Sequence, residues 1–95
     1  MSKGYLVANI RIKDKERFQE FSGMAGPVIK KFGGKVLARG PEAERLEGDV
    51  EGTVMMIEFE SKETAKKFYF SEGYQNAKAI RDACSETDLM IIEGI

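Results

Sequence analysis

The stretch that decides the fold is Val54-Met55-Met56-Ile57-Glu58-Phe59, the most apolar run of the chain. A run of this length and composition predicts a strand in the middle of a sheet. It contains one carboxylate, Glu58, and an unpaired charge in such a strand is costly. We therefore expect the folded protein to supply the Glu58 carboxylate with a hydrogen-bonding or charged partner, or with a ligand. Arg39 and Asn9 interrupt two other apolar runs in the same way.

Clean alternation of apolar and polar side chains predicts a first strand over residues 5–13. Asp14 then offers a helix N-cap, and Gly33-Gly34 offers a C-cap. Between them an apolar stripe at spacings of three and four residues predicts an amphipathic helix. Glycines and Pro27 weaken its middle, so we expect a kink or a break near Gly26.

The rest of the chain supplies three more strands and two more helical segments. Strands are expected at residues 35–39, 53–60 and 88–93, and Ser61 and Ser71 each offer an N-cap for a helix. The order strand, helix, strand, strand, helix, strand is that of the ferredoxin-like βαββαβ fold. We therefore predict a single α+β domain over residues 1–95, with a four-stranded antiparallel sheet in the order 4-1-3-2 and helices on one face.

Assigning the strand faces leaves one apolar face without a cover. The side chains expected beneath the helices are Leu6, Ala8, Ile10, Ile12, Met55, Ile57, Phe59, Met90 and Ile92. Those expected on the opposite face are Tyr5, Val7, Asn9, Arg11, Leu37, Arg39, Val54, Met56, Glu58, Leu89, Ile91 and Glu93. An apolar patch of this size usually marks an interface. We therefore expect a homodimer in which two sheets pack face to face around a two-fold axis.

Composition excludes several classes of function. The net charge is -1 with no basic stripe, so we expect no nucleic acid partner. The apolar runs are too short for a membrane, and the N-terminus has no signal-peptide core, so we expect a cytoplasmic protein. The lone Cys84 fits a reducing compartment. The chain has no histidine, and we see no metal-site spacing among its acids, so we expect neither a metal nor a cofactor.

Several motifs along the chain match a known pattern. They lie at residues 31–40, 46–48, 57–61, 70–75, 79–81 and 92–94. With them, the chain resembles the domain-of-unknown-function 1330 family of the dimeric α/β-barrel superfamily. The resemblance implies a ferredoxin-like dimer with a cavity between the sheet and the helices. It supplies no established reaction, although related branches include cofactor-independent quinol monooxygenases, haem-degrading enzymes and muconolactone-type isomerases.

The first candidate site contains Glu58, Arg39, Asn9 and Glu47. In the predicted sheet, Asn9 and Glu58 lie on neighbouring strands, and Arg39 can pair with Glu58 or with Glu47. As an active site, Glu58 would be the acid or base, and Arg39 and Asn9 would hold or polarise a small oxygenated or aromatic substrate. The alternative is a buried hydrogen-bond network that fixes the dimer.

The second candidate site contains Tyr69, Ser71, Tyr74 and Arg81. In its simplest interpretation, Ser71 is an N-cap and the two tyrosines belong to the core. Alternatively, the hydroxyls and Arg81 rim a ligand pocket, where Arg81 offers bidentate binding to a carboxylate. Three hypotheses follow: an enzyme, a non-catalytic ligand-binding or regulatory module, and a purely structural dimer.

Overall fold

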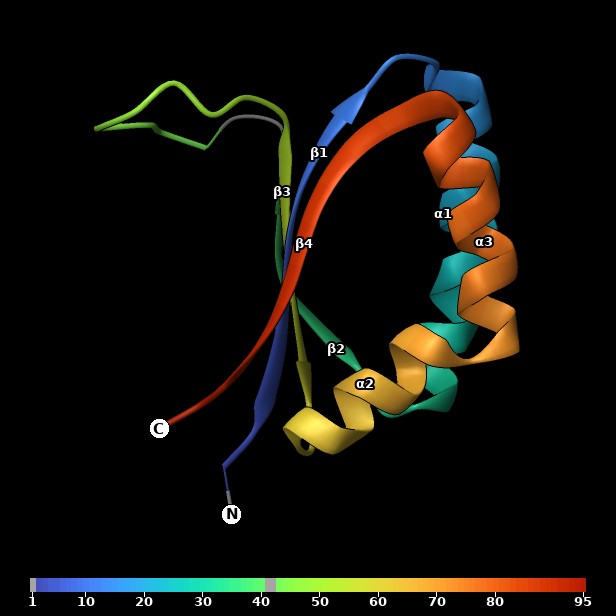
Figure 1. Cartoon of the computed structure of the whole chain (residues 1–95), viewed down its shortest axis with the longest axis vertical. Coiled ribbons are helices and arrows are strands. Elements are labelled where there is room, and N and C mark those ends of the chain that lie inside the picture. The colour runs from blue at the N-terminus through green and yellow to red at the C-terminus, as the bar shows by residue number, and fades with distance from the viewer. Residues whose placement is uncertain (1, 41–42) are drawn as a thin grey trace.

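The structure is a computed structural model that describes residues 2–40 and 43–95. In this part of the chain, the helices lie on one side of a four-stranded antiparallel sheet (Figure 1). The strand order, β2-β3-β1-β4, confirms the predicted order and the ferredoxin-like fold. The elements are β1 (Gly4–Ile12), α1 (Lys15–Lys31), β2 (Lys35–Gly40), β3 (Thr53–Phe59), α2 (Lys62–Phe70), α3 (Glu72–Cys84) and β4 (Ser85–Glu93).

Local capping signals set the helix ends as expected. The Asp14 carboxylate accepts hydrogen bonds from the first turn of α1, and Ser61 and Ser71 cap α2 and α3. After α1 the chain turns through Gly33, whose φ of 72° favours glycine.

Of the kink or break predicted in α1, the break is wrong, because the helix runs unbroken through Pro27. Proline removes the hydrogen bond to the carbonyl four residues earlier, which belongs to Gly23. Gly23 is exposed, so water can hydrate that carbonyl and the helix continues.

Aromatic packing against the inner face of the sheet forms the core. Phe59, Phe68 and Ile57 are the largest fully buried side chains. The Phe68 ring centroid lies 5.0 Å from that of Phe59 and 4.6 Å from that of Tyr74, so one ring joins α2 to both β3 and α3. The predicted alternation of β1 is confirmed, since Leu6 and its inward-facing neighbours are buried.

The face assignment of β4 was predicted with the wrong phase. Leu89 and Ile91 pack against the core, whereas Met90 and Ile92 are 58% and 57% exposed. Ile91 lies directly opposite Leu6 on β1, and directly paired residues share a face. The strand is apolar on both faces, so its sequence does not fix which side chains point inward.

The position of Arg39 was also predicted on the wrong face. Val36 lies opposite Ile57, but a register shift follows, so Arg39 lies opposite Met55. A bulge of this kind inserts one residue and moves every later side chain to the other face. Arg39 therefore lies on the helix side of the sheet, and Glu58 lies on the opposite side.

Candidate functional site

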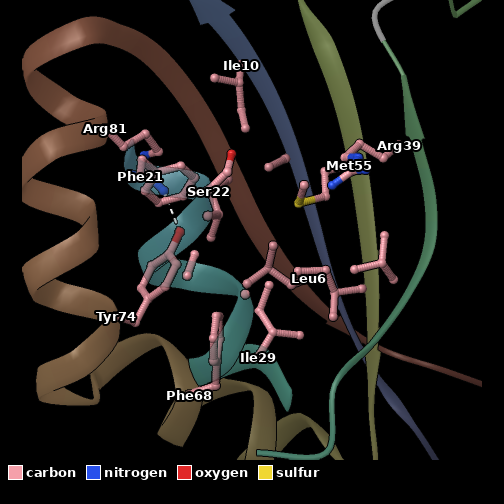
Figure 2. A pocket seen from close by; sticks show the side chains of 16 residues that line it. Leu6, Ile10, Phe21, Ser22, Ile29, Arg39, Met55, Phe68, Tyr74 and Arg81 are labelled. Carbon is pink, nitrogen blue, oxygen red and sulfur yellow. Dashed lines mark hydrogen bonds between the residues drawn. The ribbon is translucent and has the colours of Figure 1, made fainter. Parts of the chain in front are cut away.

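A cavity of about 130 Å³ lies between the sheet and the helices (Figure 2). Its helical wall comes mainly from α1 and α3, which lie side by side across from the sheet, and Phe68 of α2 closes one end (Figure 1). Strands β1, β3 and β4 contribute only apolar side chains, namely Leu6, Ala8, Ile10, Met55, Ile57 and Leu89. The resemblance implied a cavity in this position.

Arg81 and Tyr74 of α3 form a buried polar pair on this mainly apolar lining. Both side chains are only 4% exposed. Arg81 Nη1 donates to the Tyr74 hydroxyl oxygen at 2.6 Å, and Nη2 donates to Asp82 Oδ1 at 3.3 Å. Arg81 Nε is buried and finds no hydrogen-bond acceptor among residues 2–40 and 43–95. The guanidinium carbon also lies 5.8 Å from the Phe21 ring centroid and 5.9 Å from that of Tyr74.

The Tyr74 hydroxyl is a hydrogen-bond donor at neutral pH. Burial raises its pKa, and the nearby Arg81 charge only partly opposes this effect. Because the hydroxyl oxygen already accepts a hydrogen bond from Arg81, its own proton is available to another acceptor. A ligand oxygen is a suitable acceptor for it.

Asp82 neutralises Arg81 incompletely. Its side chain is 50% exposed, and it also forms a 2.7 Å ion pair with Lys78. Although burial raises the pKa of Asp82, Lys78 and Arg81 together hold it below its ordinary value. One carboxylate is thus shared between two cations.

The cavity opens between α1 and the edge strand β2. The lining residues on this side are Ser22 and Gly26 of α1 and Val36 and Arg39 of β2. All four are exposed, whereas Tyr74 and Arg81 at the opposite end of the cavity are buried. Figure 2 shows Arg39 beside Met55, across the cavity from Arg81.

Hydrogen-bond donors dominate the polar part of the lining. The described residues that line the cavity include two arginines, one tyrosine and one serine, but no carboxylate and no lysine. Guanidinium groups remain cationic and donate only. The cavity is therefore suited to holding an oxygen-bearing or anionic group, and less suited to removing a proton.

Glu58 lies on the outer face of the sheet, away from this cavity. It accepts a hydrogen bond from the Tyr5 hydroxyl at 3.0 Å, and this bond is the main cause of the raised pKa of Tyr5. Asn9 lies four residues beyond Tyr5 on β1, which places it roughly 13 Å from Tyr5 along the strand. Its side-chain amide donates instead to the carbonyl of Glu51. Glu58 is thus brought together with Tyr5, and not with Arg39 or Asn9.

The remaining candidates support the structure around the cavity or lie apart from it. The Ser71 hydroxyl accepts from the Tyr74 backbone amide and donates to the Phe68 carbonyl, as an N-cap of α3. The Tyr69 ring packs against Tyr74, with 5.6 Å between centroids. Glu47 is exposed in the connection between β2 and β3.

The sequence interpretation missed Ser22 and Gly26 as lining residues. Both lie on α1 with Ile29, at spacings of four and three residues. This spacing defines a stripe beside the apolar one that was recognised. The Ser22 hydroxyl and the small Gly26 on this stripe were the signal from which a cavity lining could have been predicted.

Fold and cavity together define a ferredoxin-like α+β protein with a small, mainly apolar cavity between sheet and helices. The chain belongs to the family described as "Domain of unknown function (DUF1330)", whose model matches residues 3–95. This confirms the resemblance noted in the sequence. Among curated protein sequences, none matches the chain.

Solved structures share this fold at low sequence identity. A protein of unknown function from Rhodopseudomonas palustris is 18% identical with a TM-score of 0.81, over 99% of this chain and 83% of that one. SnoaB, a cofactor-independent oxygenase from Streptomyces nogalater, is 10% identical with a TM-score of 0.72, over 97% and 92%. A dimeric ferredoxin-like protein of unknown function from Jannaschia sp. CCS1 is 12% identical with a TM-score of 0.72, over 96% of each chain.

These likenesses concern the fold alone.

None of the helices within residues 2–40 and 43–95 combines the length and the apolar character that a bilayer span requires.

Proposed function

We propose that this protein binds a small, largely apolar molecule with an oxygen-bearing group in the cavity between the sheet and the helices. The observation that carries the proposal is the buried Arg81–Tyr74 pair on a mainly apolar lining. Burying a guanidinium is costly unless its donors are satisfied. A concave apolar site with a few convergent polar groups is also the usual form of a ligand pocket.

The cavity volume limits the ligand to about one ring. At about 130 Å³ it is close to the roughly 150 Å³ apolar cavity that accommodates benzene. Single-ring aromatic compounds with one oxygen-bearing substituent are therefore the class to test first.

A second candidate function is catalysis in the same cavity without a cofactor. Its support is the fold shared with SnoaB, which is a cofactor-independent oxygenase. The lining favours binding over acid–base catalysis, because burial raises the pKa of Tyr74 and the arginines only donate. Since Glu58 faces the other side of the sheet, its proposed role as acid or base requires a second ligand site there. Oxygen uptake or product formation with a bound compound distinguishes catalysis from binding.

The functional unit in this proposal is a homodimer formed through the outer face of the sheet. Val7 pairs with Met56 on one side and Met90 on the other, so an apolar row crosses the sheet. Residues 43–52 extend from the sheet on the side away from the helices, and Leu46 there is 84% exposed (Figure 1). A second copy would cover both features around a two-fold axis. The Jannaschia protein of the same fold is dimeric, which supports a homodimer but does not bear on the face that forms it.

A thermal-shift and calorimetry panel tests the binding proposal. Phenol, benzyl alcohol, benzamide and benzoate are titrated into the wild-type dimer and into an Ala25→Leu variant. Ala25 is 4% exposed and lines the cavity, so leucine there fills it. A ligand at about a hundred times its dissociation constant stabilises the folded state by about 2.7 kcal/mol.

The variant supplies the control for the panel. We expect at least one compound to stabilise the wild type and none to stabilise Ala25→Leu. The proposal is wrong if no compound binds, or if the filled variant binds equally well.

A further inference from the structure

We infer that the ligand of this cavity is a monocarboxylate whose carboxylate group is bound by Arg81 and Tyr74, and that it enters between α1 and β2. This inference rests on the proposed binding function and specifies its ligand class.

Arg81 and Tyr74 together offer more donors than the protein uses. Two nitrogens of the guanidinium donate to Tyr74 and Asp82, while the buried Nε has no acceptor within the described residues. The Tyr74 hydroxyl has a proton to donate, because its oxygen accepts from Arg81. Guanidinium and hydroxyl donors this close together match the two acceptor oxygens of a carboxylate.

The charged side chains around Arg81 carry one positive charge more than negative charges. Lys78, Arg81 and Asp82 form a linked group of two cations and one anion. The described lining of the cavity adds no carboxylate to balance it. A ligand with a single negative charge would neutralise the group and offset the cost of burying the guanidinium.

The surroundings of Arg81 favour a carboxylate on an aromatic or aliphatic body over a free inorganic anion. Phe21 and Tyr74 lie near the guanidinium, and apart from Ser22 and Arg39 at the opening the rest of the lining is apolar. An inorganic anion would give up its hydration for these apolar walls. A ring carrying a carboxylate would place its apolar part against them.

The opening between α1 and β2 provides a route for such an anion. Ser22 and Gly26 on one side and Arg39 on the other are exposed, whereas Arg81 is buried. Arg39 thus places a positive charge at the entrance, across the cavity from Arg81 (Figure 2). A cation at an entrance raises the local concentration of anions.

Calorimetry with three compounds of similar size and shape tests the ligand class. Benzoate, benzamide and benzyl alcohol are titrated into the wild-type protein at pH 7.5 and fixed ionic strength. We expect benzoate to bind at least about tenfold more tightly than either neutral compound, as charge-assisted hydrogen bonds require. Equal affinities would overturn the carboxylate inference and leave the binding proposal standing. Failure of all three to bind would overturn both.

Variants assign the preference to the proposed residues. Arg81→Met should abolish the preference for benzoate over benzamide, and Tyr74→Phe should reduce benzoate affinity several-fold. The control, Arg17→Met, removes an exposed arginine of α1 and should leave the preference unchanged.

Circular dichroism establishes that each variant is folded. Should Arg81→Met not fold, Tyr74→Phe decides the matter, because it removes only one hydroxyl. A folded Arg81→Met variant that keeps the full preference, or an unchanged affinity in Tyr74→Phe, would overturn the inference.

Discussion

Removing the buried polar pair should not destabilise the protein, and this prediction separates a ligand site from a structural one. The perturbation is the double variant Arg81→Met/Tyr74→Phe. Methionine approximates the length of the arginine stem, and phenylalanine keeps the ring that packs against Phe68. Changing both residues together leaves no hydroxyl stranded after its partner is lost.

The magnitude follows from what Arg81 gains and loses in the folded state. Burying a guanidinium costs several kcal/mol even after relaxation. Against this, the charge-assisted hydrogen bond to Tyr74 returns about 1.5–3 kcal/mol, and the half-exposed Asp82 adds less than about 1 kcal/mol. Contacts with the two rings add about 0.5–2 kcal/mol each, and a methionine sulfur recovers part of this.

In the wild type, the cost of burying the guanidinium and the gain from its contacts therefore nearly cancel. Replacing a buried ionic group with apolar residues is often neutral or stabilising. We therefore expect the double variant to be about 0–2 kcal/mol more stable than the wild type. For a chain of 95 residues, each kcal/mol corresponds to about 4–8 °C in Tm.

The assay is urea denaturation followed by circular dichroism, at equal protein concentrations because a dimer's stability depends on concentration. Benzoate binding is measured on the same samples and should be lost. A double variant that loses more than about 2 kcal/mol would refute the reasoning, since Arg81 would then be a structural element of the core.

Three further predictions concern the interface, pH and glycine positions. Met56→Lys should give a folded monomer in light scattering, and a persistent dimer would contradict the outer-face interface. Above pH 10 the stability of the wild type should fall more steeply than that of Tyr74→Phe, because the raised pKa keeps the folded phenol protonated while the unfolded one ionises; parallel urea midpoints would contradict this. Gly34→Ala should cost about 1–3 kcal/mol in urea denaturation, since its Cβ would lie 2.8 Å from the Phe59 ring. The matched Gly23→Ala should stabilise the exposed helix by about 0.5–1 kcal/mol, because nothing lies within 4 Å; equal effects would refute the steric argument.

The fold was predictable because its signals are local. Alternation in β1 and the caps Asp14, Ser61 and Ser71 depend on neighbouring residues only, and the structure has each of them as expected. The element order then restricts the topology to few choices. Pro27 was misjudged because one exposed carbonyl without its helix bond does not end a helix that packing supports.

The faces of the outer strands were not predictable from alternation. β4 is apolar on both sides, so only its pairing with β1 fixes the inward side chains. In β2, a bulge after Val36 reverses the face of Arg39, and a bulge that depends on pairing with β3 leaves no clear trace in a six-residue strand.

The candidate site was predicted in part. Tyr74 and Arg81 are seven residues apart on one helix stripe, so the sequence places them together and the structure joins them by a hydrogen bond. Arg39 lines the same cavity because of the bulge in β2, which the sequence did not reveal. Glu58, the one carboxylate within the most apolar strand, accepts a hydrogen bond from Tyr5 on the other face of the sheet. A charge within an apolar strand marks a constraint, but it does not say on which side of the sheet a cavity lies.

The most direct test of the central claim observes the Arg81 Nε–H group itself. Its proton–nitrogen resonance is recorded by NMR during a benzoate titration and assigned with Arg81→Lys. We predict that this resonance shifts and saturates with the binding curve, while that of the exposed Arg17 stays in place. A saturating benzoate signal that leaves the Arg81 resonance unmoved would contradict the account.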